Sequence, residues 1–159
     1  MGTEFEHKLV VTSDEWRTAV TSSSSLSQGY LCTKPGMSIR VRLVDDATGY
    51  LTIKGKQVGI GRPEYEYEIP AEDARALLAL PADGFAIAKT RHELGGEWSG
   101  WIVDEFAGAN AGLVMAELEV PAEDSPWQVP VWAGANVTTD SRYTNAELFT
   151  RPYTQWTPN

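Results

Sequence analysis

The sequence predicts a mainly β protein of the α+β class, folded as an antiparallel sheet or barrel. The first observation is that about eight short segments alternate apolar and polar residues at the spacing of successive hairpins. The second is that only a few segments carry helical signals. The third is size and composition: 159 residues, 42% hydrophobic and 22% charged, suit one folded domain. We therefore expect a single domain over residues 1–159.

The first half of the chain is expected to form strands joined by short connections. Their limits are Phe5–Val11, Gln28–Leu31, Ser38–Val44, Tyr50–Lys56 and Glu64–Ile69. A short helix is expected to begin near Ser13, because a serine cap followed by acidic residues favours a helix start. Ser22–Ser25 is expected to be a flexible loop, and Asp45–Gly49 a turn.

The second half adds one clear helix, further strands and a tail. Pro70–Leu80 is expected to be helical, since a proline and acidic residues suit the free N–H groups and the dipole at a helix start. Strands are expected at Phe85–Leu94, Glu97–Phe106 and Leu113–Val120, the first two joined as a hairpin by two glycines. The tail from Pro121 is expected to cover the fold, with a short helix near Asn145–Phe149.

Composition excludes several classes of function. Thirteen Lys and Arg against 22 Asp and Glu give a net charge of −9, which argues against binding to nucleic acid or to an anionic membrane. One cysteine and two histidines argue against a disulfide framework, a multi-cysteine zinc site and a histidine-rich metal site. We find no targeting segment and no membrane-spanning apolar stretch, so we expect a cytoplasmic protein. The sequence leaves the oligomeric state open.

Charged residues of one sign share a face along several of the predicted strands. Arg40 and Arg42 lie opposite apolar neighbours, and so do Glu117 and Glu119. A single strand of this kind is most simply half-buried, with its polar face in water. Repetition favours another interpretation, because like charges along and across strands repel one another. The pattern indicates that acidic and basic strands face each other or enclose a highly charged ligand.

Six of the thirteen basic residues lie on these charged faces, and a seventh lies nearby. They are Lys8, Arg40, Arg42, Lys54, Lys89 and Arg91, with Arg62 as the seventh. If they converge, they form a cationic interior that suits a small polyanion such as a chain of phosphates. The glutamates would then hold a divalent cation, Mg²⁺ or Mn²⁺, that bridges them to the phosphates. A closed barrel with charged side chains inside would place the basic residues and the glutamates around one ligand.

The charged segments resemble, in chain order, the motifs of the CYTH superfamily, the triphosphate tunnel metalloenzymes. The likeness covers nearly the whole chain. Its segments are Glu4–Lys8, similar to the ExExK signature, Gln28–Leu31, Ser38–Arg42, Leu51–Gly55, Arg62–Ile69, Lys89–Arg91, Trp101–Asp104, Ala116–Glu119 and Arg142–Asn145. His7 departs from the family pattern, but the alternation puts it on the outer face, so we expect little effect.

The resemblance implies a closed eight-stranded antiparallel tunnel with a charged lumen and a few covering helices, using Mg²⁺ or Mn²⁺ to act on triphosphates. The implied catalytic residues are Glu4, Glu6, Lys8 and Glu119. The implied substrate ligands are Lys8, Arg40, Arg42, Lys54, Arg62, Lys89 and Arg91. The implied metal ligands are Glu4, Glu6, Glu66, Asp104, Glu117 and Glu119.

The short chain resembles most the bacterial tripolyphosphatase branch, which implies hydrolysis of inorganic tripolyphosphate with release of phosphate. Three alternatives stay open. A class IV type adenylate cyclase would need room for a nucleoside, and a thiamine triphosphatase could stack thiamine on an aromatic residue near the tunnel mouth. A non-catalytic polyphosphate-binding module would show the same charge pattern. A lipocalin-like carrier is disfavoured, because lumens of that kind are largely apolar.

Overall fold

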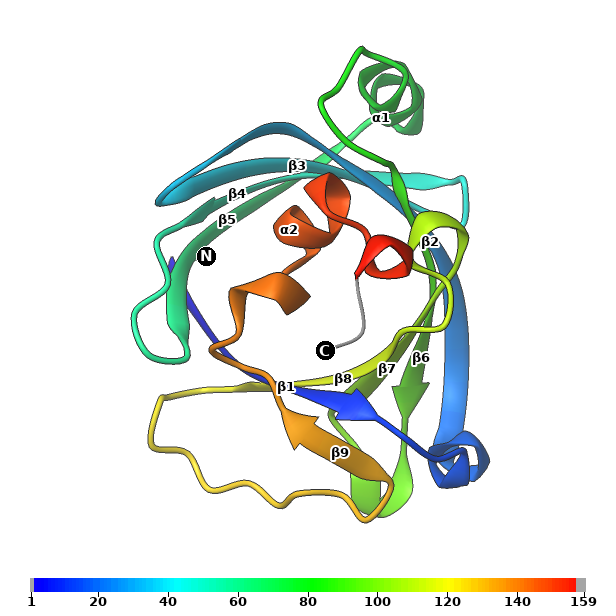
Figure 1. Cartoon of the computed structure of the whole chain (residues 1–159), viewed down its shortest axis with the longest axis vertical. Helices are drawn as coiled ribbons and strands as arrows, with labels where there is room; N and C mark the ends of the chain where they lie inside the picture. The colour runs from blue at the N-terminus through cyan, green and yellow to red at the C-terminus, as the bar shows by residue number, and fades with distance from the viewer. Residues whose placement is uncertain (1, 157–159) are drawn as a thin grey trace.

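A computed structural model describes residues 2–156 of the chain. Within that range, eight antiparallel strands close into a barrel and a ninth, β9, pairs with β1 (Figure 1). The strands are β1 Gly2–Val11, β2 Val20–Lys34, β3 Met37–Val44, β4 Thr48–Gly55, β5 Gly61–Ile69, β6 Ile87–Leu94, β7 Trp101–Phe106, β8 Val114–Val120 and β9 Ala133–Asn136. Their order is β5-β4-β3-β2-β6-β7-β8-β1, and β1 pairs with β5 to close the ring. The predicted mainly β barrel is confirmed.

Strand β1 forms the seam of the barrel, because it changes partner along its length. Residues 2–5 pair with β5, residues 5–10 pair with β8, and the pairing with β9 begins at Leu9. Just past the β5 pairing, the Glu6 amide donates to the Ile60 carbonyl oxygen at 3.1 Å. The inward-facing residues of β1 therefore lie next to residues of β5 at one end and of β8 at the other.

The prediction of a flexible loop at Ser22–Ser25 is wrong. These serines lie within β2, a strand of 15 residues, and they pair with residues 90–93 of β6. Serine has little intrinsic preference for strands, but the ladder with β6 satisfies the backbone and decides the conformation.

The helices are short and serve mainly as cover. They are α1 Ala71–Leu78, α2 Asn145–Thr150 and the 3₁₀ helices η1 Glu15–Ala19, η2 Gly96–Trp98, η3 Gly108–Asn110, η4 Ser141–Tyr143 and η5 Tyr153–Gln155. The helix predicted at Pro70–Leu80 is thus confirmed, and η2 makes the connection between β6 and β7 longer than the predicted glycine pair. Within residues 2–156, none of the helices has the length and apolar character needed to cross a bilayer.

Two of the three apolar clusters lie on the outer face of the barrel, under this cover. Ala74 of α1 packs with Val41 and Leu43 of β3. On another side, Trp16 of η1 clusters with Trp101 of β7 and with a tryptophan of the tail. Because apolar contacts stabilise the outside of the wall, the inside is free to carry charge.

Helix α2 lies over one opening of the barrel (Figure 1). Leu148 and Phe149 anchor it, since both are buried in an apolar cluster with residues of β2, β6 and β7. The Thr144 hydroxyl caps the helix by accepting a hydrogen bond from the Glu147 amide at 3.2 Å. The short helix predicted near Asn145–Phe149 is confirmed and brings the tail to the mouth of the barrel.

Candidate active site

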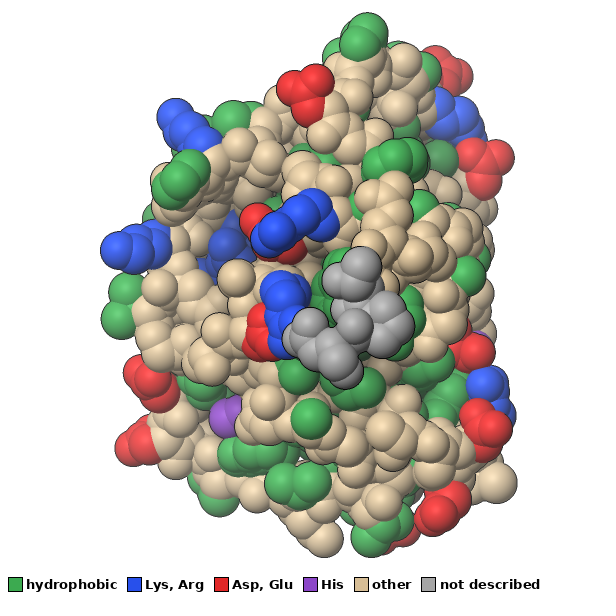
Figure 2. Space-filling model, viewed as in Figure 1, with side chains coloured by type: hydrophobic (Ala, Val, Ile, Leu, Met, Phe, Trp, Pro, Cys, Tyr) green, Lys and Arg blue, Asp and Glu red, His purple; other side chains and the backbone are tan. Residues whose placement is uncertain are grey.

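A cavity of about 660 Å³ occupies the barrel interior and is lined at one end by α2. Figure 2 shows basic and acidic side chains grouped together on this face of the molecule. The predicted site residues that line the cavity are Glu4, Glu6, Lys8, Arg40, Arg42, Lys54, Arg62, Glu66, Arg91, Glu117 and Glu119. Charged side chains that are far apart in the sequence therefore meet in one hollow.

The alternation of side chains along each strand explains why these groups face inward. In β1, Glu4, Glu6 and Lys8 line the cavity. His7 is instead buried on the outer face, where its ring stacks on Trp127 with 4.1 Å between centroids. Successive residues of a barrel strand point alternately inside and outside, so the predicted outward position of His7 is confirmed.

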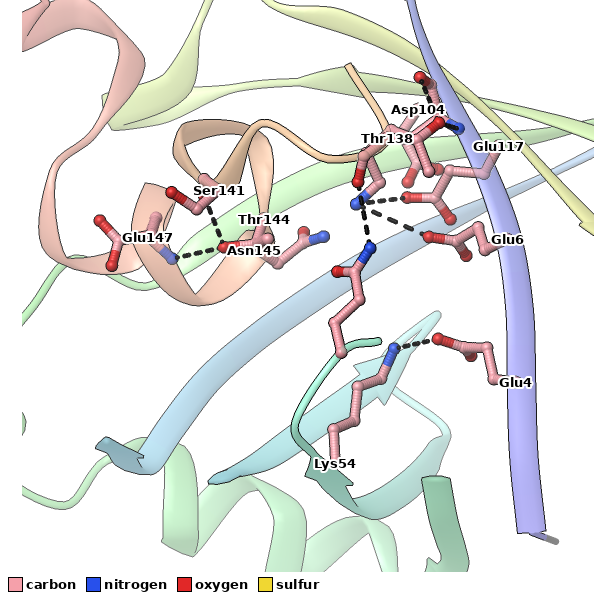
Figure 3. A network of polar contacts seen from close by, with 12 residues as sticks. Glu4, Glu6, Lys54, Asp104, Glu117, Thr138, Ser141, Thr144, Asn145 and Glu147 are labelled. Atoms are coloured by element: carbon pink, nitrogen blue, oxygen red, sulfur yellow. Dashed lines mark hydrogen bonds and ion pairs between the residues drawn. The ribbon is translucent and has the colours of Figure 1, made fainter. Parts of the chain in front are cut away.

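The Lys8 ammonium lies between Glu6 and Glu117, two carboxylates of the cavity wall that are labelled in Figure 3. Its Nζ is 3.7 Å from Glu6 Oε1 and 3.6 Å from Glu117 Oε1. Burial opposes the charge of Lys8, but Glu117 and Glu6 outweigh it and raise the pKa of Lys8. Burial and the charge of Glu117 together raise the pKa of Glu6 to about 7. Two carboxylates therefore share one lysine, and their mutual repulsion is only partly relieved.

Further ion pairs cover the β1–β5–β4 side of the cavity. Lys54 Nζ lies 2.8 Å from Glu4 Oε1 (Figure 3) and 3.1 Å from Glu64 Oε2. Arg40 Nη2 lies 3.4 Å from Glu66 Oε2. These cations are held by acids of neighbouring strands, so the wall is a mixed network and not a purely cationic lining.

Arg42 differs from its neighbours, because it has no carboxylate partner among residues 2–156. Its Nε donates to Gln28 Oε1 at 2.9 Å, which is a neutral acceptor. Loss of solvent, with the nearby charges of Arg40 and Arg91, lowers the pKa of Arg42. The charge of Arg42 is therefore available to an anion that enters the cavity.

Lys89 and Asp104 do not line the cavity, in contrast to their implied roles as phosphate and metal ligands. Lys89 Nζ lies 2.8 Å from Asp104 Oδ2, and both side chains are fully buried. Arg91 donates to the two Asp104 oxygens at 2.9 Å each. Burial lowers the pKa of Lys89 to about 7, although Asp104 acts in the opposite direction. The carboxylate of Asp104 therefore supports the buried charge of Lys89 and holds it away from the cavity surface.

Asp104→Asn is expected to destabilise the fold by about 3–5 kcal/mol, since it leaves Lys89 buried without its carboxylate. Urea unfolding followed by tryptophan fluorescence would measure this loss. Glu119 is an exposed residue of β8, so Glu119→Gln should change the free energy of unfolding by no more than about 0.5 kcal/mol. Equal losses in the two variants would contradict a structural role for the buried pair.

Sequence reasoning missed several neutral residues of the wall. The Thr52 hydroxyl donates to Glu66 Oε2 at 2.7 Å, and Gln28 holds Arg42. Thr52 alternates in phase with Lys54, and this signal could have identified it. Asn145, which lines the cavity from α2, follows no strand alternation, and its signal in the sequence was its place in the Arg142–Asn145 segment that resembles a family motif.

The acidic wall fits a divalent cation that binds together with an anionic ligand. Within the described residues, no three Asp, Glu, His or Cys side chains stand close enough to hold an ion by themselves. Mg²⁺ commonly uses one or two carboxylates and fills its other positions with water and substrate phosphates. Glu6 and Glu117 supply such a pair, and a cation would stabilise the charged form of Glu6, whose pKa burial and the charge of Glu117 raise to about 7.

Known proteins share both the sequence pattern and the fold. The CYTH domain family matches residues 2–153. The chain belongs to the CYTH family. An inorganic triphosphatase from Acetivibrio thermocellus is 42% identical over 153 residues, which cover 96% of this chain and 97% of that protein. An inorganic triphosphatase from Nitrosomonas europaea is 34% identical over 150 residues, which cover 92% of this chain and 96% of that protein.

Solved structures resemble this CYTH chain over most of its length. The crystal structure of an inorganic triphosphatase has a TM-score of 0.65 at 28% identity and covers 94% of this chain and 96% of its own. An adenylyl cyclase candidate from Hippeastrum, with a dominant triphosphatase activity, has a TM-score of 0.59 at 15% identity and covers 75% and 80% of the two chains. The latter likeness bears on the fold alone. The resemblance inferred from the motifs is confirmed.

Proposed function

We propose that this protein hydrolyses inorganic tripolyphosphate with Mg²⁺ or Mn²⁺ and releases phosphate. The observation that carries the proposal is the meeting of Arg40, Arg42 and Arg91 with paired carboxylates in one enclosed cavity. A small polyanion and a divalent cation together would satisfy both signs of charge. The names of the two relatives above, which this chain matches over nearly all of their length, support an inorganic substrate.

The basic residues would bind and orient the triphosphate. Arg40 and Arg42 face the cavity from β3, Lys54 from β4 and Arg91 from β6. A triphosphate bound by side chains of several strands would be held in one orientation relative to the attacking water. Phosphoryl transfer depends mainly on this positioning and on neutralisation of charge, so these contacts would supply most of the acceleration.

The CYTH triphosphatases are in general metal-dependent. Glu4, Glu6, Glu117 and Glu119 would hold Mg²⁺ or Mn²⁺ here, and the ion would supply charge neutralisation and a more acidic water. Lys8, between Glu6 and Glu117, favours the charged form of both carboxylates and can donate to a phosphate oxygen. As the water oxygen bonds to the terminal phosphorus, the bond from that phosphorus to the bridging oxygen would break and pyrophosphate would leave. The water would lose its proton to a glutamate of this wall.

The cavity offers little aromatic surface to a triphosphate that carries a large organic group. Among the described residues that line it, Tyr30 is the sole aromatic side chain, and a nucleoside or thiamine group would gain little stacking there. This favours the inorganic substrate over the adenylate cyclase and thiamine triphosphatase alternatives.

Arg40→Ala and Glu119→Gln are each expected to lower kcat/KM for tripolyphosphate by about 10²–10³-fold, because each removes a charge that binds substrate or metal. Phosphate release with Mg²⁺ or Mn²⁺ would measure the loss. If release survives both changes unaltered, the proposed site is wrong.

The same preparation separates the alternative functions. We expect phosphate from tripolyphosphate and little reaction of ATP or thiamine triphosphate. Cyclic AMP from ATP would instead indicate a cyclase, and tight metal-independent binding of tripolyphosphate without turnover would indicate a binding module. Single-domain organisation over residues 1–159, whose ends lie outside the described residues, stays a prediction. So do a cytoplasmic location and a lack of nucleic-acid and membrane partners.

A further inference from the structure

Asn145 connects helix α2 to the wall of the tunnel. Its Oδ1 accepts hydrogen bonds from Gln28 Nε2 at 2.9 Å and from Lys89 Nζ at 3.1 Å. Gln28 lies on β2 and is completely buried, and Lys89 lies on β6. The first residue of the covering helix therefore bonds to two strands of the barrel.

The orientation of the Asn145 amide follows from its partners. The Arg42 guanidinium has no acceptor atom, so the Gln28 atom that it contacts at 2.9 Å must be the carbonyl oxygen. The Gln28 NH₂ group is then the part that faces Asn145, and it requires an oxygen there. The contact from the Lys89 ammonium, which is also a donor, requires the same oxygen.

With Oδ1 held in this way, the Nδ2 group of Asn145 must point in the other direction. Asn145 lines the cavity, and within residues 2–156 its Nδ2 makes no hydrogen bond. In Figure 3 the Asn145 side chain extends from α2 with its nitrogen at the far end. A donor of fixed direction therefore faces the space in which the basic residues converge.

We propose that Asn145 is a triphosphate-binding residue, whose Nδ2 group donates to a phosphate oxygen of the substrate that occupies the tunnel. This inference rests on the proposed function, because it names a further ligand for the same substrate. The contact would link α2 directly to the bound triphosphate, so that the tail takes part in binding and does more than cover the barrel.

The neutral character of the Arg42–Gln28–Asn145 chain supports this role. A carboxylate at Gln28 or Asn145 would also hold these donors, but it would cancel positive charge near Arg42 that the polyanion needs. Amide oxygens fix the same donors and leave the charge of Arg42 intact. Each amide also has a second group for the next partner, which is Asn145 in the case of Gln28 and the cavity in the case of Asn145.

Binding of tripolyphosphate, measured by titration calorimetry in EDTA so that no turnover occurs, would test the proposal. Asn145→Ala is expected to weaken binding by about 10- to 100-fold, the effect of one hydrogen bond to a charged group. Asn145→Asp keeps an oxygen for Gln28 and Lys89 but replaces the donor with a charged acceptor, so it should weaken binding at least as much.

Thr150→Asp is the charge-matched control. Thr150 lines the same cavity from the same helix, and among the described residues its hydroxyl bonds only within α2, to the Glu147 carbonyl oxygen at 3.2 Å. We expect Asn145→Asp to bind tripolyphosphate at least about tenfold more weakly than Thr150→Asp, because only the former loses a direct donor. The melting temperature of each variant without ligand would identify loss of folding.

Equal affinities of Asn145→Asp and Thr150→Asp, or wild-type affinity in Asn145→Ala, would overturn the assignment of Asn145 and leave the proposed function intact. Failure of the wild-type protein to release phosphate from tripolyphosphate with Mg²⁺ or Mn²⁺ would overturn the proposed function itself.

Discussion

Arg42→Gln should remove most of the activity without destabilising the protein. We expect kcat/KM for tripolyphosphate to fall by about 10²–10³-fold. The glutamine Nε2 occupies nearly the position of the arginine Nε, so it can keep the hydrogen bond to Gln28 Oε1. What the substitution removes is a charge that burial, Arg40 and Arg91 all disfavour in the folded protein, as the lowered pKa of Arg42 indicates.

The melting temperature without ligand should therefore stay the same or rise. For a chain of this size, 1 kcal/mol of relieved repulsion corresponds to about 2–4 °C. Tripolyphosphate should raise the melting temperature of the wild-type protein more than that of Arg42→Gln, because bound ligand stabilises the folded state.

Arg17→Gln provides the matched control for Arg42. Arg17 is a half-exposed residue of η1 on the outside of the barrel, and it pairs with Glu105 at 2.9 Å. The Arg17→Gln variant should have the same kcat/KM as the wild-type protein. An Arg42→Gln variant that melts several degrees lower, or that retains full activity, would show that Arg42 serves the fold and not the substrate.

Glu117→Gln should raise the concentration of Mg²⁺ or Mn²⁺ needed for half-maximal phosphate release by at least about tenfold, and should lower the maximal rate. The reason is that it removes one of two carboxylates that face each other across Lys8 and that we expect to hold the cation. Titration of each metal into protein first stripped with EDTA would measure both effects, and EDTA alone should abolish release by the wild-type protein.

Glu68→Gln is the control for Glu117. Glu68 lies on β5 and is exposed, and it does not line the cavity. The Glu68→Gln variant should need the same concentration of Mg²⁺ or Mn²⁺ for half-maximal phosphate release as the wild-type protein. If Glu117→Gln also shows the wild-type metal requirement, the cation is held elsewhere.

The charged face of each strand could be predicted from the sequence, because side chains alternate along a strand whatever its neighbours are. Alternation places Arg40 with Arg42, Glu117 with Glu119, and His7 on the opposite side from Glu6 and Lys8. The structure keeps each of these groupings. The order of the motifs also predicted the family and, through it, the closed barrel.

Pairing between strands could not be predicted, because it depends on which strands become neighbours. Ser22–Ser25 has the composition of a loop, and only the ladder with β6 makes it a strand. Lys89 and Asp104 have the alternation and the motif positions of cavity residues, but a contact of 2.8 Å between two adjacent strands holds them together, buried away from the cavity surface.

By itself, the sequence determined the barrel, its charged interior and the residues that supply the charge, since these follow from local alternation and from the order of the motifs. Only the tertiary structure decided which charges are free and which are already neutralised. In the fold, Arg42 bonds to a neutral glutamine, Lys89 forms an ion pair with Asp104, and Asn145 of the tail lies at the cavity. The reason is that ion pairing and desolvation act over a few ångströms in space, between residues that lie far apart along the chain.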